Sequence, residues 1–156
     1  HLHIDHTEGL ATLCVAGLGY TLLVQTQKEK HEHNFNTREG AAIVESACLQ
    51  ETGDWKSLFP GLGVFPIGGH TPGSTLFAAW IGEVLYLFPG DTTNSKREIL
   101  QDRGKGAVYS YLLVPEDTGQ TAALRRWLKQ KDSDAGVRVL VSHDLEDIQS
   151  QAVLPL

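Results

Sequence analysis

Hydrophobic residues recur along this chain with two spacings, one typical of helices and one typical of strands. Residues 7–17 and 37–50 each place apolar side chains on one helical face, which predicts two helices in the first third of the chain. Short apolar runs bounded by turn residues predict strands at Tyr20–Gln25, Gly63–Ile67, Thr75–Trp80, Val84–Phe88 and Val137–Val141. Helices interleaved with strands favour an α/β layered fold, with functional side chains at strand ends and in loops.

The second half of the chain contains three further segments. Residues 91–106 are polar and are expected to be irregular, whereas Ala107–Val114 is an apolar strand candidate. A helix is expected over Asp117–Gln130, because Asp117 and Gln120 resemble a capping box at its start. A tight turn that contains Gly82 joins the strand pair ahead of them.

The bulk composition is ordinary for a globular domain. With 156 residues, 41% of them apolar and 21% charged, the chain is expected to form one domain over residues 1–156. No apolar run approaches the roughly 18 residues that cross a bilayer, so a membrane partner is not expected. The formal net charge of −6 argues against a nucleic-acid partner, since phosphates usually need a basic surface.

Cysteine is sparse and histidine is abundant. Cys14 and Cys48 have neither the close spacing of a thiolate metal site nor the number needed for a disulfide framework. They are interpreted as two buried thiols, which favours a reducing, cytoplasmic compartment. Seven histidines are the unusual feature, because four of them stand in short segments punctuated by glycine or aspartate.

Four side chains that can bind a metal ion stand within the first six residues, His1-Leu2-His3-Ile4-Asp5-His6. Alternate side chains of an extended segment share a face, so His1 and His3 are expected to point the same way. Asp5 and His6 then fall at the turn into the next helix. Imidazole and carboxylate ligands suit zinc and its neighbours. A purification tag or a chance polar terminus is the alternative, but the alternating apolar residues suit a strand packed on a core.

Three later segments place further metal-competent side chains next to predicted strands. His70 lies in a turn rich in glycine and proline just before one strand, Asp91 follows another, and His143 follows a third. A lone histidine at a strand end is usually structural. Together with the opening segment, however, each of the three stands where a loop can aim it at one shared site.

The order His-x-His-x-Asp-His, Gly-His-Thr-Pro-Gly-Ser, Gly-Asp and Ser-His-Asp resembles the signature of the metallo-β-lactamase superfamily. The gaps are also similar, with 64 residues from His6 to His70, 21 from there to Asp91 and 52 from there to His143. The resemblance spans the chain and implies the αββα sandwich, an α/β fold of two similar halves. Several strands normally precede the first histidine motif, so the domain is expected to be incomplete at its N-terminus and to lack its N-terminal strands. A separate N-terminal segment or self-association would then complete it.

The resemblance also implies a role for each candidate ligand. A first metal would be held by His1, His3 and His70, a second by Asp5, His6 and His143, and Asp91 would bridge the two. The implied cofactors are two divalent metal ions, with zinc as the first choice and iron or manganese as alternatives. A hydroxide shared by both ions would attack the substrate while one ion stabilises the developing oxyanion. The implied catalytic residues are Asp91, as the bridge, and Asp5, which would orient the attacking water.

Local features are similar to the acyl-homoserine-lactonase-like branch of the superfamily. They are Leu23-Val24-Gln25, Leu58-Phe59-Pro60-Gly61 and Ser142-His143-Asp144-Leu145-Glu146. The resemblance implies a hydrolase that cleaves a small-molecule ester, lactone or thioester. One departure is Asn94, which stands where those lactonases carry a tyrosine that assists the substrate carbonyl. Tyr109 and Tyr111 are nearby in the sequence.

Other interpretations stay open. A glyoxalase-II-like thioesterase shares the bridging aspartate, whereas many zinc β-lactamases replace it, so Asp91 argues against a true β-lactamase. The scaffold can also serve as a non-catalytic binding or regulatory module, although such modules usually lack several ligands. His31 and His33 stand in a charged stretch and are interpreted as solvated residues outside the metal site.

Overall fold

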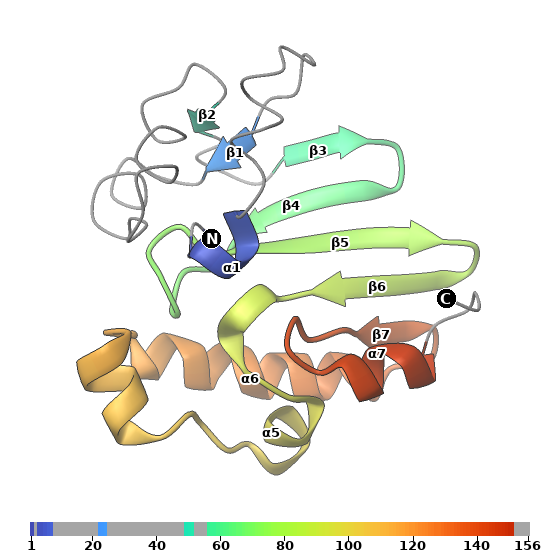
Figure 1. The fold of residues 1–156 in the computed structure, drawn as a ribbon. Coiled ribbons are helices and arrows are strands. Elements are labelled where there is room, and N and C mark those ends of the chain that lie inside the picture. The colour runs from blue at the N-terminus through green and yellow to red at the C-terminus, as the bar shows by residue number, and fades with distance from the viewer. Residues whose placement is uncertain (2, 8–21, 25–48, 52–55, 152–156) are drawn as a thin grey trace.

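The computed structural model describes residues 1, 3–7, 22–24, 49–51 and 56–151 of the chain. Within these residues, the strands form a five-stranded sheet and a separate two-stranded pair (Figure 1). The pair joins β1 (Leu22–Val24) and β2 (Leu49–Glu51) in parallel. The described architecture is therefore α/β, in agreement with the sequence prediction.

The direction of the strands in the larger sheet determines where its loops meet. Its strands, in spatial order, are β3 (Lys56–Phe59), β4 (Leu62–Pro66), β5 (Thr75–Ile81), β6 (Val84–Phe88) and β7 (Val137–Val139). The first four pair antiparallel in succession, and β7 pairs parallel to β6. Consequently β4, β6 and β7 all run in one direction, and their carboxyl ends lie at the same end of the sheet.

Helices connect and cover these strands. The helical segments are α1 (Ile4–Thr7), η1 (Gly90–Thr92), α5 (Lys96–Gln101), the π-helix η2 (Tyr109–Leu113), α6 (Thr118–Asp132) and α7 (Leu145–Gln151). The longest, α6, begins where the sequence predicts, because the Asp117 carboxylate accepts a hydrogen bond of 2.9 Å from the backbone N–H of Gln120. Figure 1 shows α5 and α6 together on one side of the sheet.

The buried core lies between the sheet and these two helices. Side chains alternate along each strand, so that Leu76 of β5 and Leu87 of β6 point to the helical side. They pack there with Ile99 of α5 and Leu128 of α6. Because both helices are fixed to the sheet by this cluster, the loops that precede and follow them are held in place as well.

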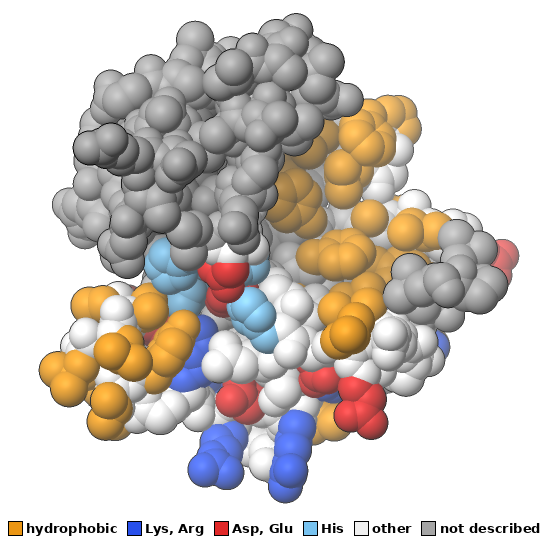
Figure 2. Space-filling model, in the orientation of Figure 1, with side chains coloured by type: hydrophobic (Ala, Val, Ile, Leu, Met, Phe, Trp, Pro, Cys, Tyr) orange, Lys and Arg blue, Asp and Glu red, His pale blue; other side chains and the backbone are white. Residues whose placement is uncertain are grey.

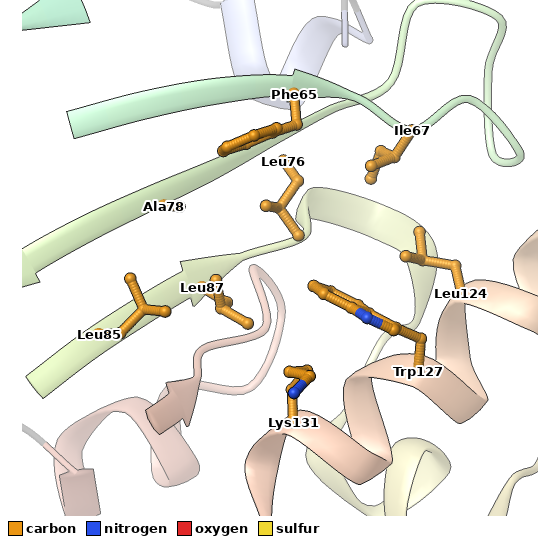
Figure 3. A pocket seen from close by; sticks show the side chains of 9 residues that line it. All are labelled: Phe65, Ile67, Leu76, Ala78, Leu85, Leu87, Leu124, Trp127 and Lys131. Carbon is orange, nitrogen blue, oxygen red and sulfur yellow. The ribbon is translucent and has the colours of Figure 1, made fainter. Parts of the chain in front are cut away.

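An apolar cavity of about 400 Å³ opens beside this core, between α6 and strands β4, β5 and β6 (Figure 3). Its lining includes Phe65, Leu76, Leu124 and Trp127, and Lys131 is its one charged lining residue. Since the lining residues include no histidine or acidic side chain, this cavity is not the candidate metal centre.

The strand predictions are largely confirmed. Strands β1, β4, β5, β6 and β7 lie within two residues of the predicted ends, and the hairpin turn between β5 and β6 contains Gly82 as expected. Strand β3 and helix α7 are additional elements that the hydrophobic pattern did not predict.

Two predictions in the second half are wrong. Ala107–Val114 is not a strand, because its centre forms η2, in which the Val114 N–H donates to the Tyr109 carbonyl. A short apolar run cannot separate strand from helix by periodicity alone. Residues 91–106 are also not wholly irregular, since they contain α5. The missed signal was the Ser95-x-x-Glu98 spacing, for the Ser95 hydroxyl accepts from the Glu98 N–H.

The helices predicted in the first third are only partly testable. Helix α1 begins at Ile4 and includes Thr7, whereas 8–17 lie outside the described residues. The end of the helix predicted over 37–50 is wrong, because Leu49 and Gln50 belong to β2. Cys14, Cys48, His31 and His33 also lie outside the described residues. No helix in the described part of the chain is long and apolar enough to cross a membrane.

We predict that Leu128→Ala destabilises the fold far more than Leu100→Ala does. Leu128 is 0% exposed in the core, whereas Leu100 is 52% exposed on α5. Truncation of a buried leucine costs about 2–5 kcal/mol, because transfer free energy is lost and a cavity is left. Urea denaturation should therefore show a large fall in the free energy of unfolding for Leu128→Ala and a small one for Leu100→Ala. Equal effects would mean that α6 does not anchor the sheet.

Candidate metal centre

All seven candidate ligands lie at the end of the sheet where β4, β6 and β7 finish. His70 is in the loop after β4, Asp91 is in η1 after β6, and His143 is in the turn after β7. The N-terminal segment with α1 supplies the other four (Figure 1). Figure 2 shows histidine and acidic side chains gathered together on this part of the surface.

Three imidazoles, those of His1, His3 and His70, form a first group. One ring nitrogen of each lies within 4.8 Å of the others. The His70 Nε2 atom is 3.2 Å from the His3 Nδ1 atom. His1 and His3 face the same group, as their alternate positions in the sequence predict.

A second group contains Asp5, His6, Asp91 and His143. The Nε2 atom of His143 lies 3.5 Å from Asp5 Oδ2, and that of His6 lies 3.8 Å from the same oxygen. Asp5 and His6 are both in α1, one residue apart, and so reach this group from adjacent positions.

The Asp91 carboxylate lies between the two groups. Its Oδ2 atom is 3.7 Å from His1 Nε2 and 3.9 Å from His70 Nε2, both in the first group. The same oxygen is 3.0 Å from His143 Nε2, and Oδ1 is 3.1 Å from His6 Nε2. One carboxylate thus faces imidazoles of both groups, which is the position that a bridging ligand requires.

The loop that carries His70 is fixed by its own sequence. The Ser74 hydroxyl accepts a hydrogen bond of 3.0 Å from the Thr71 N–H, and the Ser74 N–H donates to the Thr71 carbonyl. Gly69 adopts φ +83°, a region that favours glycine, and a Cβ atom there would lie 2.9 Å from the Thr121 methyl group. This close approach lets the loop pack against the start of α6.

The His143 turn is fixed by Asp144. One Asp144 oxygen accepts from the Asp147 N–H and so caps α7, while the other accepts a 2.8 Å hydrogen bond from the Lys96 N–H at the start of α5. His143 is therefore held between two helix N-termini.

The two groups differ in their access to solvent. In the first group, His70 is 0% exposed and the His1 side chain is 2% exposed. By contrast, the Asp5 side chain is 52% exposed and that of His143 is 41% exposed. The second group therefore forms the open side of the site.

The donor set fits divalent cations. The buried His6 Nε2 and Asp91 Oδ1 atoms lie 3.1 Å apart but make no hydrogen bond, although buried polar atoms are nearly always paired. Ring nitrogens and carboxylate oxygens within 4.8 Å of one another are the ligand types that zinc and related metals bind. A cation in each group would satisfy the lone pairs that otherwise face one another.

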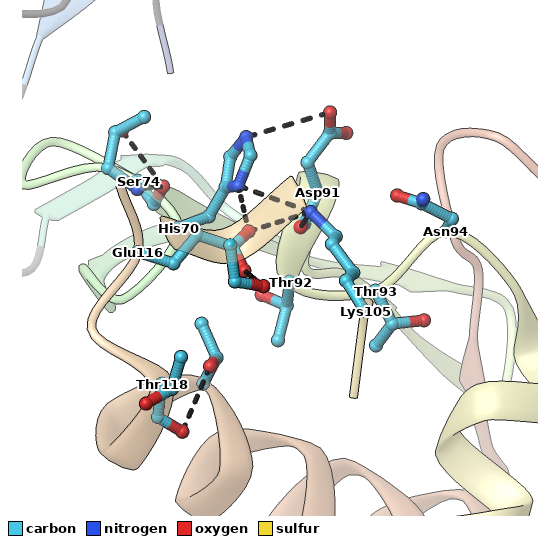
Figure 4. A network of polar contacts seen from close by, with 12 residues as sticks. His70, Ser74, Asp91, Thr92, Thr93, Asn94, Lys105, Glu116 and Thr118 are labelled. Carbon is cyan, nitrogen blue, oxygen red and sulfur yellow. Dashed lines mark hydrogen bonds and ion pairs between the residues drawn. The ribbon is translucent and has the colours of Figure 1, made fainter. Parts of the chain in front are cut away.

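The residues that hold His70 from behind were not among the candidates predicted from the sequence. The Nδ1 atom of His70 lies 2.5 Å from Glu116 Oε1, and Lys105 Nζ donates to that oxygen at 2.9 Å (Figure 4). Lys105 Nζ also donates to the Asp91 carbonyl at 2.6 Å, and the Ser110 hydroxyl donates to Glu116 Oε2 at 2.8 Å. These residues stand in segments taken to be irregular loop and strand, so no periodic signal marked them.

Two carboxyl groups of the site have shifted pKa values. Burial alone would raise the pKa of Asp91, but the imidazoles of His6 and His143 outweigh burial and hold that pKa well below its ordinary value. Burial would likewise raise the pKa of Glu116, but hydrogen bonds from His70 and Lys105 outweigh burial and lower it. Both groups are therefore carboxylates at neutral pH.

The structure separates the two tyrosines that the sequence placed near Asn94. Burial and the negative charges of Glu116, Asp91 and Asp5 raise the pKa of Tyr109. The Tyr109 phenol therefore interacts electrostatically with carboxylates of the site. The side chain of Tyr111 is instead largely exposed. Asn94 uses its backbone N–H to donate to Glu98 Oε2 at 2.8 Å, which ties it to α5.

Comparison with known proteins gives one family and several similar structures. The sequence profile of the metallo-beta-lactamase superfamily matches residues 1–143. No match was found among curated proteins.

The similar solved structures include N-acyl homoserine lactone hydrolases. One, with the product N-hexanoyl-L-homoserine bound at its catalytic metal center, aligns with a TM-score of 0.62 and 16% identity over 86% of this chain and 51% of the other. A quorum-quenching N-acyl homoserine lactone lactonase aligns with a TM-score of 0.62 and 16% identity, over 90% of this chain and 56% of the other. A probable metal-dependent hydrolase from Staphylococcus aureus aligns with a TM-score of 0.53 and 16% identity, over 78% of this chain and 44% of the other. These likenesses show the fold, and this chain spans about half the length of those proteins.

We predict that Gly69→Ala weakens both folding and metal binding, whereas Gly82→Ala weakens folding alone. Both glycines have positive φ, at +83° and +63°, so alanine is strained by about 1–2 kcal/mol at either position. Only at position 69 would the new methyl group also collide with Thr121 and displace His70. Thermal unfolding and zinc titration of the two variants test this difference. Equal zinc affinities would show that the close approach does not position His70.

We also predict a pH dependence for the effect of Glu116→Gln, measured in chelator. Because the folded-state pKa of Glu116 is lowered, its carboxylate stabilises the fold above the unfolded pKa, and this stability is lost as pH falls through the folded pKa. Glu116→Gln should therefore cost about 1–3 kcal/mol in free energy of unfolding at pH 7 and progressively less between pH 5 and pH 3. Glu83→Gln, a change at the exposed hairpin, is the control, and it should leave the free energy of unfolding nearly unchanged over the same pH range. A cost that grows on acidification would contradict the prediction.

Proposed function

This chain belongs to the metallo-β-lactamase superfamily, and we propose that it is a metal-dependent hydrolase with a two-metal site at the end of its five-stranded sheet. The observation that carries the proposal is the meeting of two ligand groups at the Asp91 carboxylate. Enzymes that use two cations for hydrolysis hold them about 3.5–4 Å apart, so their ligands must share one small region. The arrangement supports the metal assignment inferred from the sequence.

The proposed role of each side chain follows from its place in the two groups. The first cation would be held by His1, His3 and His70, the second by Asp5, His6 and His143, and both by Asp91. When bound, the two cations would lower the pKa of water towards neutrality and polarise the substrate carbonyl. Asp5 offers a half-exposed carboxylate on the open side, so it can accept a hydrogen bond from the attacking water and hold its proton at Oδ2.

We propose that the substrate reaches the site from this open side. His70 and Asp91 are buried, whereas Asp5 and His143 meet solvent. Figure 2 shows hydrophobic side chains close to the histidine and acidic ones. The exposed apolar side chains of the molecule include Leu112 and Leu113 of η2. This surface supports a small ester, lactone or thioester with an apolar portion. The lactone hydrolases of similar fold are in keeping with that class.

We predict that His3→Ala and Asp91→Ala abolish both metal loading and hydrolysis, whereas His33→Ala changes neither. His3 belongs to the first group and Asp91 lies between both groups, so either loss removes ligand atoms from the metals. Elemental analysis should find about two equivalents of zinc, iron or manganese in the unaltered protein. Assays on a panel of lactones, esters and thioesters should show activity that chelation removes and metal restores.

Two results would overturn the proposed function. An unaltered protein that binds no divalent metal would instead support a non-catalytic binding module on the same scaffold. Equal losses in His3→Ala, Asp91→Ala and His33→Ala would show that the assignment of the histidines is wrong.

A further inference from the structure

The geometry points to Glu116 as a positioning residue that fixes the tautomer of His70 and sets the metal affinity of the first group. This inference rests on the proposed two-metal site and adds to it a residue outside both ligand groups. Glu116 touches no other candidate ligand side chain in the described structure; its contact is with the far nitrogen of the His70 ring.

The direction of the hydrogen bond between Glu116 and His70 determines which ring nitrogen of His70 carries the proton. Both Glu116 oxygens accept hydrogen bonds, Oε1 from the Lys105 ammonium and Oε2 from the Ser110 hydroxyl, as a carboxylate does, and a carboxylate only accepts. The 2.5 Å contact with His70 Nδ1 therefore requires the proton to be on Nδ1. The nearby Lys105 ammonium, 3.2 Å from the same nitrogen, cannot accept that proton. Nε2 is then left with its lone pair, and this is the nitrogen that faces His3 and Asp91.

Hydrogen bonds to both of its carboxylate oxygens hold the Glu116 side chain against His70. Its Oε1 atom accepts from Lys105, and its Oε2 atom accepts from the Ser110 hydroxyl. The backbone N–H of Glu116 donates to the Ser110 carbonyl, and the next N–H, of Asp117, donates to the Gly69 carbonyl beside His70. Backbone and side chain thus hold the same ligand loop from two adjacent residues.

Lys105 and Glu116 form a buried ion pair behind the first group. The side chains of Lys105 and Glu116 are each only 3% exposed, and burial of an ion pair gains little stability after desolvation. Lys105 also donates to the backbone carbonyl of Asp91, so the pair connects the loop of the first group to the backbone of the residue whose carboxylate lies between the groups. A buried pair placed behind two ligands is better explained by their orientation than by stability alone. An anionic acceptor on the far nitrogen also makes a metal-binding imidazole more basic.

The variant Glu116→Gln tests this role, because it keeps the size of the side chain and removes its charge. Metal affinity should be measured by competition with a chromophoric chelator, using zinc alone as the probe. We expect the affinity for one of the two zinc equivalents to fall about 10-fold to 100-fold and the affinity for the other to change much less. The matched control is Glu83→Gln, an identical chemical change at the exposed hairpin between β5 and β6, which should leave both affinities unchanged.

A second measurement needs no substitution at Glu116. In histidine-selectively ¹⁵N-labelled protein, with His70 assigned by the signal lost in His70→Ala, the ring nitrogens report which one carries the proton. We expect protonated Nδ1 both before and after zinc is added. A purely structural ion pair would not set this spectroscopic signature.

The outcomes separate this inference from the proposed function. Wild-type zinc affinities in a folded Glu116→Gln, or zinc bound through Nδ1 of His70, would overturn the role of Glu116 while leaving a metal hydrolase intact. If Glu116→Gln does not fold, the nitrogen spectrum of the unaltered protein decides. An unaltered protein that binds no zinc refutes the proposed function, and the metal-free spectrum still tests the tautomer.

Discussion

The shared direction of β4, β6 and β7 is the constraint on which the rest of this site depends. Strands that run the same way finish at the same end of a sheet, so the loops after them are forced together. These loops carry His70, Asp91 and His143, which are far apart in sequence. The helices α5 and α6 then hold the loops in place through the core beneath the sheet.

Bringing these side chains together has an electrostatic cost that the surrounding residues offset. The buried His6 Nε2 and Asp91 Oδ1 atoms lose water and make no hydrogen bond in return. His70 is compensated from behind by Glu116, whose charge is balanced by Lys105. Asp91 receives a similar contribution, since Lys105 donates to its carbonyl. In the first group His70 and the His1 side chain are buried, whereas Asp5 and His143 of the second group are open to solvent.

This asymmetry gives the two groups different tasks in the proposed mechanism. A closed set of three imidazoles suits retention of a cation, because no ligand has to move. An open set with a half-exposed carboxylate suits exchange of water and entry of substrate. The apolar surface of η2 lies on the same side of the molecule, where it can contact the part of the substrate that does not react.

Local pattern predicted the elements whose residues interact with near neighbours. Strand β6 and the start of α6 were predicted correctly because alternation and an Asp117 cap are short-range signals. Ala107–Val114 was not, because it pairs with no strand in the described part of the chain and its apolar side chains remain largely exposed in η2. Helix α5 was not predicted because the segment 91–106 is polar, although Ser95 and Glu98 have the spacing of a helix cap.

For the site, the sequence by itself determined the ligand types and their order, from His1 to His143. It did so because metal ligation requires particular side chains, and their motifs are visible without coordinates. The resemblance to the superfamily implied the two groups and the place of Asp91 between them, but only the tertiary structure supplied the distances between these side chains and placed Glu116 and Lys105 behind His70. Those facts depend on contacts between residues that are 11 to 138 positions apart in the chain, and spacing along a sequence does not specify distance in space.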